Sequence, residues 1–100
     1  MPEKFKEKPR GALEVLGKDF EKICDKWKIE EELREKLKEL IRKWDSLMSI
    51  KDEYKRAAEK MRVASEIIEK IDLKDREKIE NCLMELMIVF VDKVRKRFYH

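Results

Sequence analysis

Residues 79–98 have the sequence IENCLMELMIVFVDKVRKRF, and this stretch decides the expected fold. Its apolar residues recur at alternating steps of three and four, the spacing of one face of an α-helix. The main series consists of Ile79, Leu83, Leu86, Phe90, Val94 and Phe98, with Cys82 and Met87 beside it. We therefore predict a long amphipathic helix, which needs other helices against which it can bury this face.

Three earlier segments show the same spacing, so we expect helices over about 11–27, 30–47, 50–71 and 75–98. Trp27, Trp44 and Tyr54 occupy positions in these apolar stripes and are expected in the core. No segment alternates with period two for long enough to predict a strand. Helices of this length with short loops favour antiparallel neighbours. The prediction is an all-α antiparallel four-helix bundle, and the alternative is two or three longer helices forming an intertwined helical dimer.

The helix ends are predicted from capping residues and from shifts of the apolar stripe. Residues 27–29 contain no Gly, Pro, Ser or Asn. The stripe nevertheless changes phase there and three glutamates follow, which favours a tight turn over one long helix. Ser49, with Asp52 three residues later, resembles a capping box for the third helix. Either Asp72 or Asp75 is expected to cap the fourth.

The composition limits what the chain can be. Of the 100 residues, 26 are Lys or Arg and 23 are Asp or Glu, so the net charge is +3. A dedicated nucleic-acid-binding domain is usually more one-sided. The abundance of Lys, Glu and Arg resembles that of hyperthermophile proteins, and a designed chain is the alternative. We expect one helical domain over residues 11–100, preceded by a flexible basic arm over residues 1–10.

Several kinds of site are excluded by residue counts. Gly17 is the last glycine, so no Gly-rich phosphate loop follows it. The two cysteines and the one histidine are too few for a structural zinc site. Cys24 and Cys82 each lie among apolar helical positions and are expected to be buried free thiols, which fits a reducing interior. We expect no cofactor.

The expected location is the cytoplasm, because the sequence shows neither a signal for export nor a segment that could insert into a membrane. The first residues have no apolar core of the kind that a signal peptide carries. The longest nearly continuous apolar run is residues 82–91, whereas a membrane span needs about 20 residues. We therefore expect no association with a membrane.

Two short motifs suggest an enzyme. Glu31, Glu32 and Glu35 form an EExxE string, and Glu69 with Asp72 forms a downstream ExxD. This pair resembles the metal-binding motifs of the all-helical MazG-type nucleoside triphosphate pyrophosphohydrolases. The resemblance implies Mg²⁺ bound by the carboxylates and hydrolysis of nucleotides. The alternative is that these acids only favour the ends of helices, where acids are common.

The second motif is the RxxxxH string from Arg95 to His100. It resembles the motif of HEPN ribonucleases, small helical dimers that cut RNA. The resemblance implies that the Arg and the His face the scissile phosphate and that the His moves the 2′-OH proton. The alternative is a set of basic residues favourably placed at a helix C-terminus. We assign no catalytic residue, and an enzyme is our third hypothesis.

Nine of the ten residues in 82–91 are apolar, and this arc is wider than one bundle core normally covers. Three explanations remain open. The N-terminal arm folds back with Phe5 as its anchor, the fourth helix is the most buried of the four, or the extra surface is an interface. We favour an interface, with a second copy or another protein, formed by Met84, Met87, Ile88 and Val91.

Basic residues gather at both ends of the chain, where they would form a positive patch for phosphates if the ends meet. They are Lys4, Lys6, Lys8, Arg10, Lys93, Arg95, Lys96 and Arg97. Our first functional hypothesis is a non-enzymatic interaction or assembly module that self-associates through residues 82–91. The second is a nucleic-acid-binding accessory subunit of a ribonucleoprotein or DNA-processing complex. The third is a small helical enzyme of one of the two kinds above.

Overall fold

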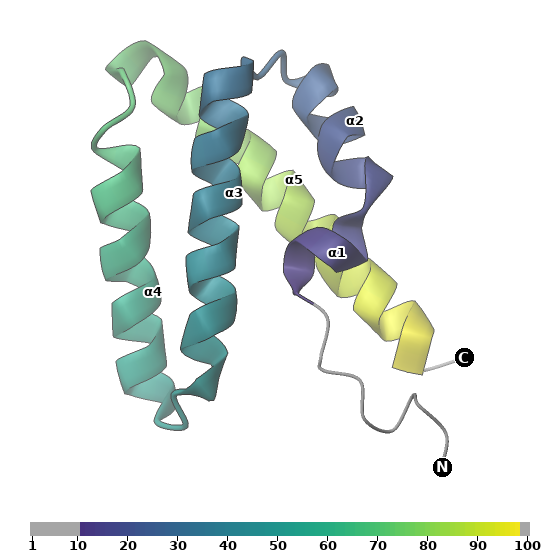
Figure 1. The fold of residues 1–100 in the computed structure, drawn as a ribbon, viewed down its shortest axis with the longest axis vertical. Helices are drawn as coiled ribbons and strands as arrows, with labels where there is room; N and C mark the ends of the chain where they lie inside the picture. The colour runs from purple at the N-terminus through teal and green to yellow at the C-terminus, as the bar shows by residue number, and fades with distance from the viewer. Residues whose placement is uncertain (1–10, 99–100) are drawn as a thin grey trace.

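The computed structural model describes the backbone of residues 11–98 and the side chains of residues 11–96. These residues form only helices and connecting turns (Figure 1). In chain order they are α1 (Ala12–Leu16), α2 (Lys18–Lys26), α3 (Glu31–Ser46), the 3₁₀ turn η2 (Leu47–Ser49), α4 (Glu53–Ile68) and α5 (Leu73–Phe98). The predicted all-α class is therefore confirmed for this part of the chain.

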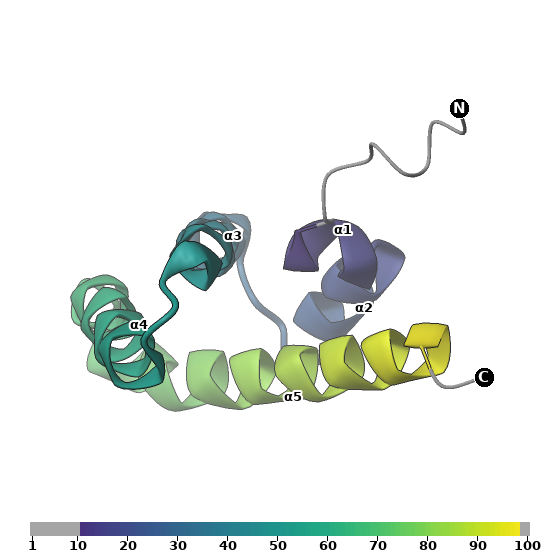
Figure 2. The same ribbon diagram turned by 90° about the horizontal axis from the view of Figure 1, so that it is seen from below.

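The helices are arranged around α5, which is the longest. α3 and α4 form a helical hairpin, and α1 and α2 lie on the other side of α3 (Figure 1). When the molecule is turned by 90°, α5 lies beneath both the α3–α4 hairpin and the α1–α2 pair (Figure 2). It begins directly after Asp72, the first of the two residues predicted to cap it. One side of α5 therefore supports the other helices, and its opposite side faces away from them.

A single apolar core joins α2, α3, α4 and α5 with the end of α1. α5 contributes Ile79, Cys82, Leu83 and Leu86 to it. The remaining buried residues are Leu16, Phe20, Ile23, Cys24, Ile29, Leu33, Leu37, Leu40, Ile41, Val63, Ile67 and Ile71. Burying this much aliphatic surface is the main favourable contribution to folding.

The two cysteines meet across the contact between α2 and α5. Both are fully buried and both are free thiols, as the sequence predicted. A hydrogen bond with Cys82, together with burial, raises the pKa of the Cys24 thiol. The reactive thiolate form of Cys24 is therefore disfavoured.

The helix predicted over residues 11–27 is divided at Gly17, so that prediction is corrected. Gly17 has φ 53° and ψ −128°, a backbone conformation that residues with a Cβ rarely adopt. Its N–H donates to the carbonyl of Leu13 at 3.0 Å and ends α1 there. A glycine within an apolar stripe is tolerated in many helices, but here it separates two of them.

The tight turn predicted between the helices over residues 11–27 and 30–47 is present. Lys28 has φ 55°, the left-handed conformation. Its N–H donates to the carbonyl of Asp25 at 3.1 Å, and the N–H of Ile29 donates to that of Cys24 at 2.9 Å. These two bonds form a Schellman motif, in which glycine usually takes the left-handed position. A lysine takes it here, so the turn has no Gly signal in the sequence.

The start of α4 differs from the prediction. The cap is Asp52, whose side chain accepts the N–H groups of Tyr54 at 2.9 Å and Lys55 at 3.2 Å. Ser49 was predicted to cap this helix, and that prediction is wrong. It belongs to η2, and its hydroxyl donates to the carbonyl of Ser46 at 3.3 Å. The helix starts later because the intervening backbone is extended at residue 50.

The predicted buried face of α4 is also wrong in phase. Tyr54, expected in the core, is 90% exposed, and Met61, two turns later on the same side of the helix, is 72% exposed. The helix instead buries Val63 and Ile67. The face toward α3 includes a lysine, which a search for apolar residues does not count.

That lysine is Lys60, and it explains how the hairpin packs. The indole Nε1 of Trp44 donates to the Lys60 carbonyl at 3.1 Å, and the Lys60 Nζ lies 5.4 Å from the centre of the Trp44 ring. A lysine stem covers apolar surface while its charge stays near water. Trp44 and Trp27 are partly buried and packed against the core, in agreement with their stripe positions.

Candidate interaction surface

α5 carries an apolar surface on the side away from the core. The four residues predicted to form an interface, Met84, Met87, Ile88 and Val91, are between 43% and 64% exposed. Their spacing of three and four residues places them along one side of the helix. We call this surface the outer face of α5. Its exposure excludes the alternative in which the predicted fourth helix is the most buried of all. Phe5, the anchor in the alternative of a folded-back arm, lies outside the described residues.

The outer face of α5 is unusual for the surface of one folded chain. Single exposed apolar residues are normal, but adjacent large ones mark contact sites more often. Each Å² of apolar area removed from water contributes about 25 cal/mol. Two of the four residues are methionines, whose flexible side chains adapt to a partner. Covering the outer face of α5 would therefore lower the free energy of the protein.

A charged residue of opposite sign flanks the outer face at each end. Glu80 precedes Met84 by four residues and Arg95 follows Val91 by four, so each lies next to its apolar neighbour on the helix surface. Both are exposed. Among the described residues, neither takes part in an ion pair. Both charges are therefore available to a partner.

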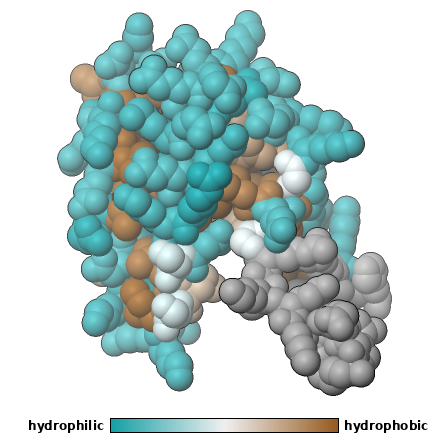
Figure 3. Space-filling view, in the orientation of Figure 1, coloured by the Kyte–Doolittle hydropathy of each residue, from teal (hydrophilic) through white to brown (hydrophobic). Residues whose placement is uncertain are grey.

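An apolar groove adjoins the outer face. It has a volume of about 430 Å³ and lies between α5, α1 and the hairpin. Its lining includes Trp44, Met48, Leu86, Met87 and Phe90. Figure 3 shows apolar side chains between α3 and the α1–α2 pair, on a face that is otherwise mostly hydrophilic. Met87 belongs to both the groove and the outer face, which joins the two surfaces.

One wall of the groove depends on a contact that the sequence did not predict. The N–H of Ala12 donates to the two carboxylate oxygens of Asp45 at 3.1 and 3.3 Å, so a residue of α3 caps α1. A Cβ on Gly11 would lie 2.8 Å from the Asp45 Oδ2. Such a contact is too close for most side chains. Gly11 therefore permits α1 to approach α3.

Of the basic residues predicted to contact nucleic acid, the structure describes the side chains of Lys93, Arg95 and Lys96. The Lys93 Nζ donates to the carbonyls of Val15 at 3.2 Å and Leu16 at 2.9 Å, and it pairs with Asp19 at 2.6 Å. The hydrogen bond from Lys93 holds the pKa of the Asp19 carboxyl below its usual value. Lys93 is thus a cap for the carbonyls that end α1.

The other predicted basic residues are only partly described. Arg95 and Lys96 are exposed, and Lys96 pairs with Asp92 at 3.3 Å. His100, the last residue of the RxxxxH motif, lies outside the described residues. So do Lys4, Lys6, Lys8, Arg10 and the side chain of Arg97.

The acidic motifs lie at one end of the hairpin. Glu31, Glu32 and Glu35 are exposed on the first turns of α3, and Glu69 and Asp72 follow the end of α4 at the same side (Figure 1). Among residues 11–96, no three His, Cys, Asp or Glu side chains gather closely enough to hold a metal ion. The described part of the chain therefore offers no metal site to support the resemblance to pyrophosphohydrolases.

Glu85 links α5 to the end of α2 through hydrogen bonds that sequence patterns did not predict. Its Oε1 accepts the Trp27 Nε1 hydrogen at 2.8 Å and one from the Lys26 Nζ at 3.0 Å. The bonds from Lys26 and then Trp27 hold the pKa of the Glu85 carboxyl below its usual value. The one charged residue within 82–91 thus fixes the end of α2.

Comparison with family models, curated proteins and solved structures found no match. The helices of the described part also include none with the length and apolar content needed to span a membrane. The functional argument therefore rests on the surfaces and contacts given above.

Proposed function

We propose that this protein is a non-enzymatic interaction or assembly module that self-associates through the outer face of α5. The observation that carries the proposal is the continuous exposure of Met84, Met87, Ile88 and Val91 on one helix face. Covering these side chains removes apolar area from water, which is the usual source of association free energy.

The positions of these residues favour a second copy as the cover. Met84 and Val91, like Met87 and Ile88, are placed symmetrically about a point between residues 87 and 88. In an antiparallel pair of α5 helices centred there, Met84 lies level with Val91 of the second copy. Twofold symmetry requires each contact to occur twice. The apolar residues of both copies then overlap completely.

The flanking charges support the same register. Residues 80 and 95 are equally far from that centre, so Glu80 lies level with Arg95 of the second copy, and the reverse. A parallel pair would place Glu80 beside Glu80 and Arg95 beside Arg95. Charges at the rim of an interface select orientation more than they add affinity. The charge pattern therefore favours antiparallel pairing of two copies.

We extend this proposal to the packing of the whole protein as an antiparallel four-helix bundle, in which α1 and α2 together take the place of one helix. The α3–α4 hairpin and the contacts of α5 with α1, α2 and α3 support it. The alternative of an intertwined dimer is not favoured, because the helices of one chain already share a core.

The test is to place a charge in the centre of the outer face. Ile88→Glu should convert a dimer into a monomer, because the dimer would bury two unpaired carboxylates. The molar mass is measured by light scattering, and circular dichroism verifies that the variant remains helical. The matched variant is Met61→Glu, which puts the same charge at an exposed methionine of α4. A dimer that survives Ile88→Glu, or one that is lost only in Met61→Glu, would contradict the proposal.

A further inference from the structure

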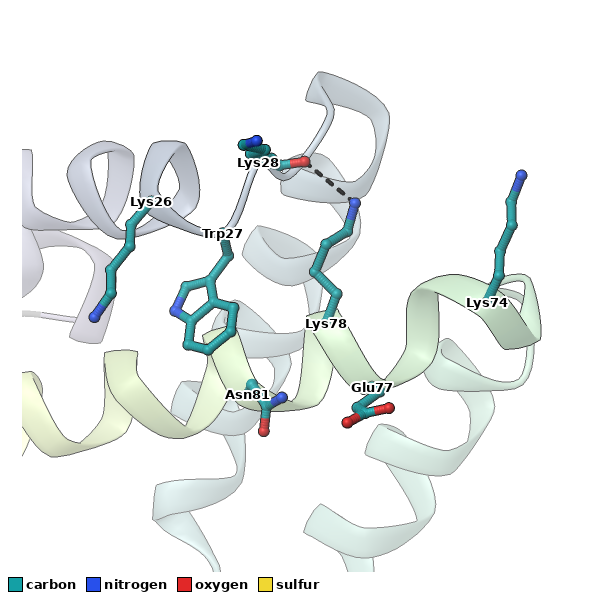
Figure 4. Close-up of a pocket in the computed structure, with 7 residues that line it drawn as sticks. All are labelled: Lys26, Trp27, Lys28, Lys74, Glu77, Lys78 and Asn81. Atoms are coloured by element: carbon teal, nitrogen blue, oxygen red, sulfur yellow. Dashed lines mark hydrogen bonds between the residues drawn. The ribbon is translucent and has the colours of Figure 1, made fainter.

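A recess with a different chemistry lies at the other end of α5, around Trp27. It has a volume of about 340 Å³ and lies between the end of α2 and the first turns of α5. Figure 4 shows the indole ring of Trp27 standing over α5, with lysine side chains on both sides. The residues around Trp27 are Lys26, Lys28, Lys74, Glu77, Lys78 and Asn81.

The ring of Trp27 is held in place by the protein. Its Nε1 donates to the Glu85 Oε1 at 2.8 Å, so the polar edge of the indole is already used. The Lys78 Nζ donates to the carbonyl of Lys28 at 3.2 Å and joins α5 to the turn after α2 (Figure 4). Both walls of the recess are thus fixed before any ligand arrives, which lowers the entropy cost of binding.

The recess concentrates positive charge. Four lysines and one glutamate line it, and two of these lysines, Lys26 and Lys78, already pair with carboxylates. Lys28 and Lys74 are exposed. Among the described residues, neither joins an ion pair. These two ammonium groups are therefore available to an anion, one from each wall.

We infer that this recess binds a nucleotide unit, with the base stacked on Trp27 and neighbouring phosphates attracted to Lys28 on one wall and to Lys74 on the other. Proteins that bind single-stranded nucleic acids combine aromatic side chains with basic ones, since each base offers an aromatic face and each phosphate a negative charge. The amide of Asn81 offers both a donor and an acceptor to the edge of a base. An acidic peptide would use the lysines but would not stack on the ring, whose centre lies 5.7 Å from the Lys26 Nζ.

A free nucleotide and a nucleotide within a single strand share this chemistry, and the experiment separates them. Trp44→Phe leaves Trp27 as the only tryptophan, because the chain has two. Its fluorescence is then titrated with a 15-mer of oligodeoxythymidylate and with thymidine monophosphate. Quenching by either ligand supports the inference, and the weaker ligand identifies the source that is not used. Binding should weaken as salt rises, because phosphate contacts release counterions.

The variants separate a specific recess from general attraction to a basic protein. Lys28→Glu combined with Lys74→Glu should weaken oligonucleotide binding about 10-fold or more, since two phosphate contacts become repulsive. The control pair is Lys51→Glu with Lys55→Glu, which changes the net charge equally at exposed positions near the start of α4. Circular dichroism checks the fold of both. Equal losses in the two pairs, an unquenched Trp27, or equal binding of polyglutamate would overturn the inference.

Discussion

The two sides of α5 are both apolar but have opposite environments. On the inner side, Ile79, Cys82, Leu83 and Leu86 are at most 8% exposed. On the outer face, the four apolar residues are at least 43% exposed. The other helices of one chain lie against a single side of α5 (Figure 2). Hydropathy therefore indicates that a surface favours burial, but it does not show whether the same chain or another molecule covers that surface.

The largest effect is expected from removing a side chain on the inner side. Leu86 is 1% exposed, so Leu86→Ala should lower the free energy of unfolding by about 2–5 kcal/mol through lost burial and a new cavity. Urea denaturation at low protein concentration measures this free energy. Ile88→Ala on the outer face should cost less than about 1 kcal/mol under the same conditions. Equal losses would erase the distinction between the two sides.

The second prediction concerns the charges that flank the outer face. Glu80→Arg or Arg95→Glu alone should weaken self-association about 10-fold, because both rim pairs become repulsive. The double exchange should restore it. Sedimentation equilibrium measures the dissociation constants, with Lys96→Glu as the control next to Arg95. A parallel pair predicts that the two single variants associate as the wild type does.

A smaller effect is expected at the turn that sets α2 against the inner side of α5. Lys28→Gly should raise the free energy of unfolding by about 0.5–1 kcal/mol, since glycine adopts the left-handed conformation without strain. Chemical denaturation measures the change. The dissociation constant of the dimer should stay the same, because the turn is not part of the outer face. A loss of stability would show that the lysine side chain matters more than its backbone strain.

The smallest effect is expected from Glu85, whose pKa is lowered in the folded state. A carboxyl with a lowered folded pKa stabilises above its unfolded pKa, and that stabilisation is lost as pH falls through the folded pKa. Glu85→Gln should therefore lower the Tm slightly at pH 7 and leave it unchanged at pH 2. Thermal melts at both pH values check this. A difference that persists in acid would assign the effect to packing instead of charge.

The sequence predicted the helical class well, because helical spacing is a local property of the chain. It missed the break at Gly17 and placed the start of α4 incorrectly, since those depend on backbone conformation and on Asp52. It also failed for Tyr54, because Lys60 rather than an apolar residue packs on Trp44. Local spacing cannot show when a charged side chain supplies the packing surface.

The two candidate sites differ in the same way. The exposed residues of the outer face were predicted, because the apolar arc of residues 82–91 is too wide for one core. The recess around Trp27 was not, since Lys28 and Lys74 belong to distant parts of the sequence and line the same recess only through the packing of α2 on α5. Of the basic residues predicted at the chain ends, Lys93 caps α1, and those of residues 1–10 lie outside the described part of the chain.

The central claim is that a second copy covers the outer face of α5. The most direct measurement is the molar mass of the wild-type protein by sedimentation velocity over a series of rising concentrations. The mass should rise from the 12.2 kDa of one chain toward twice that value and stay there. A mass of 12.2 kDa at every concentration, or growth beyond the dimer, would contradict the claim.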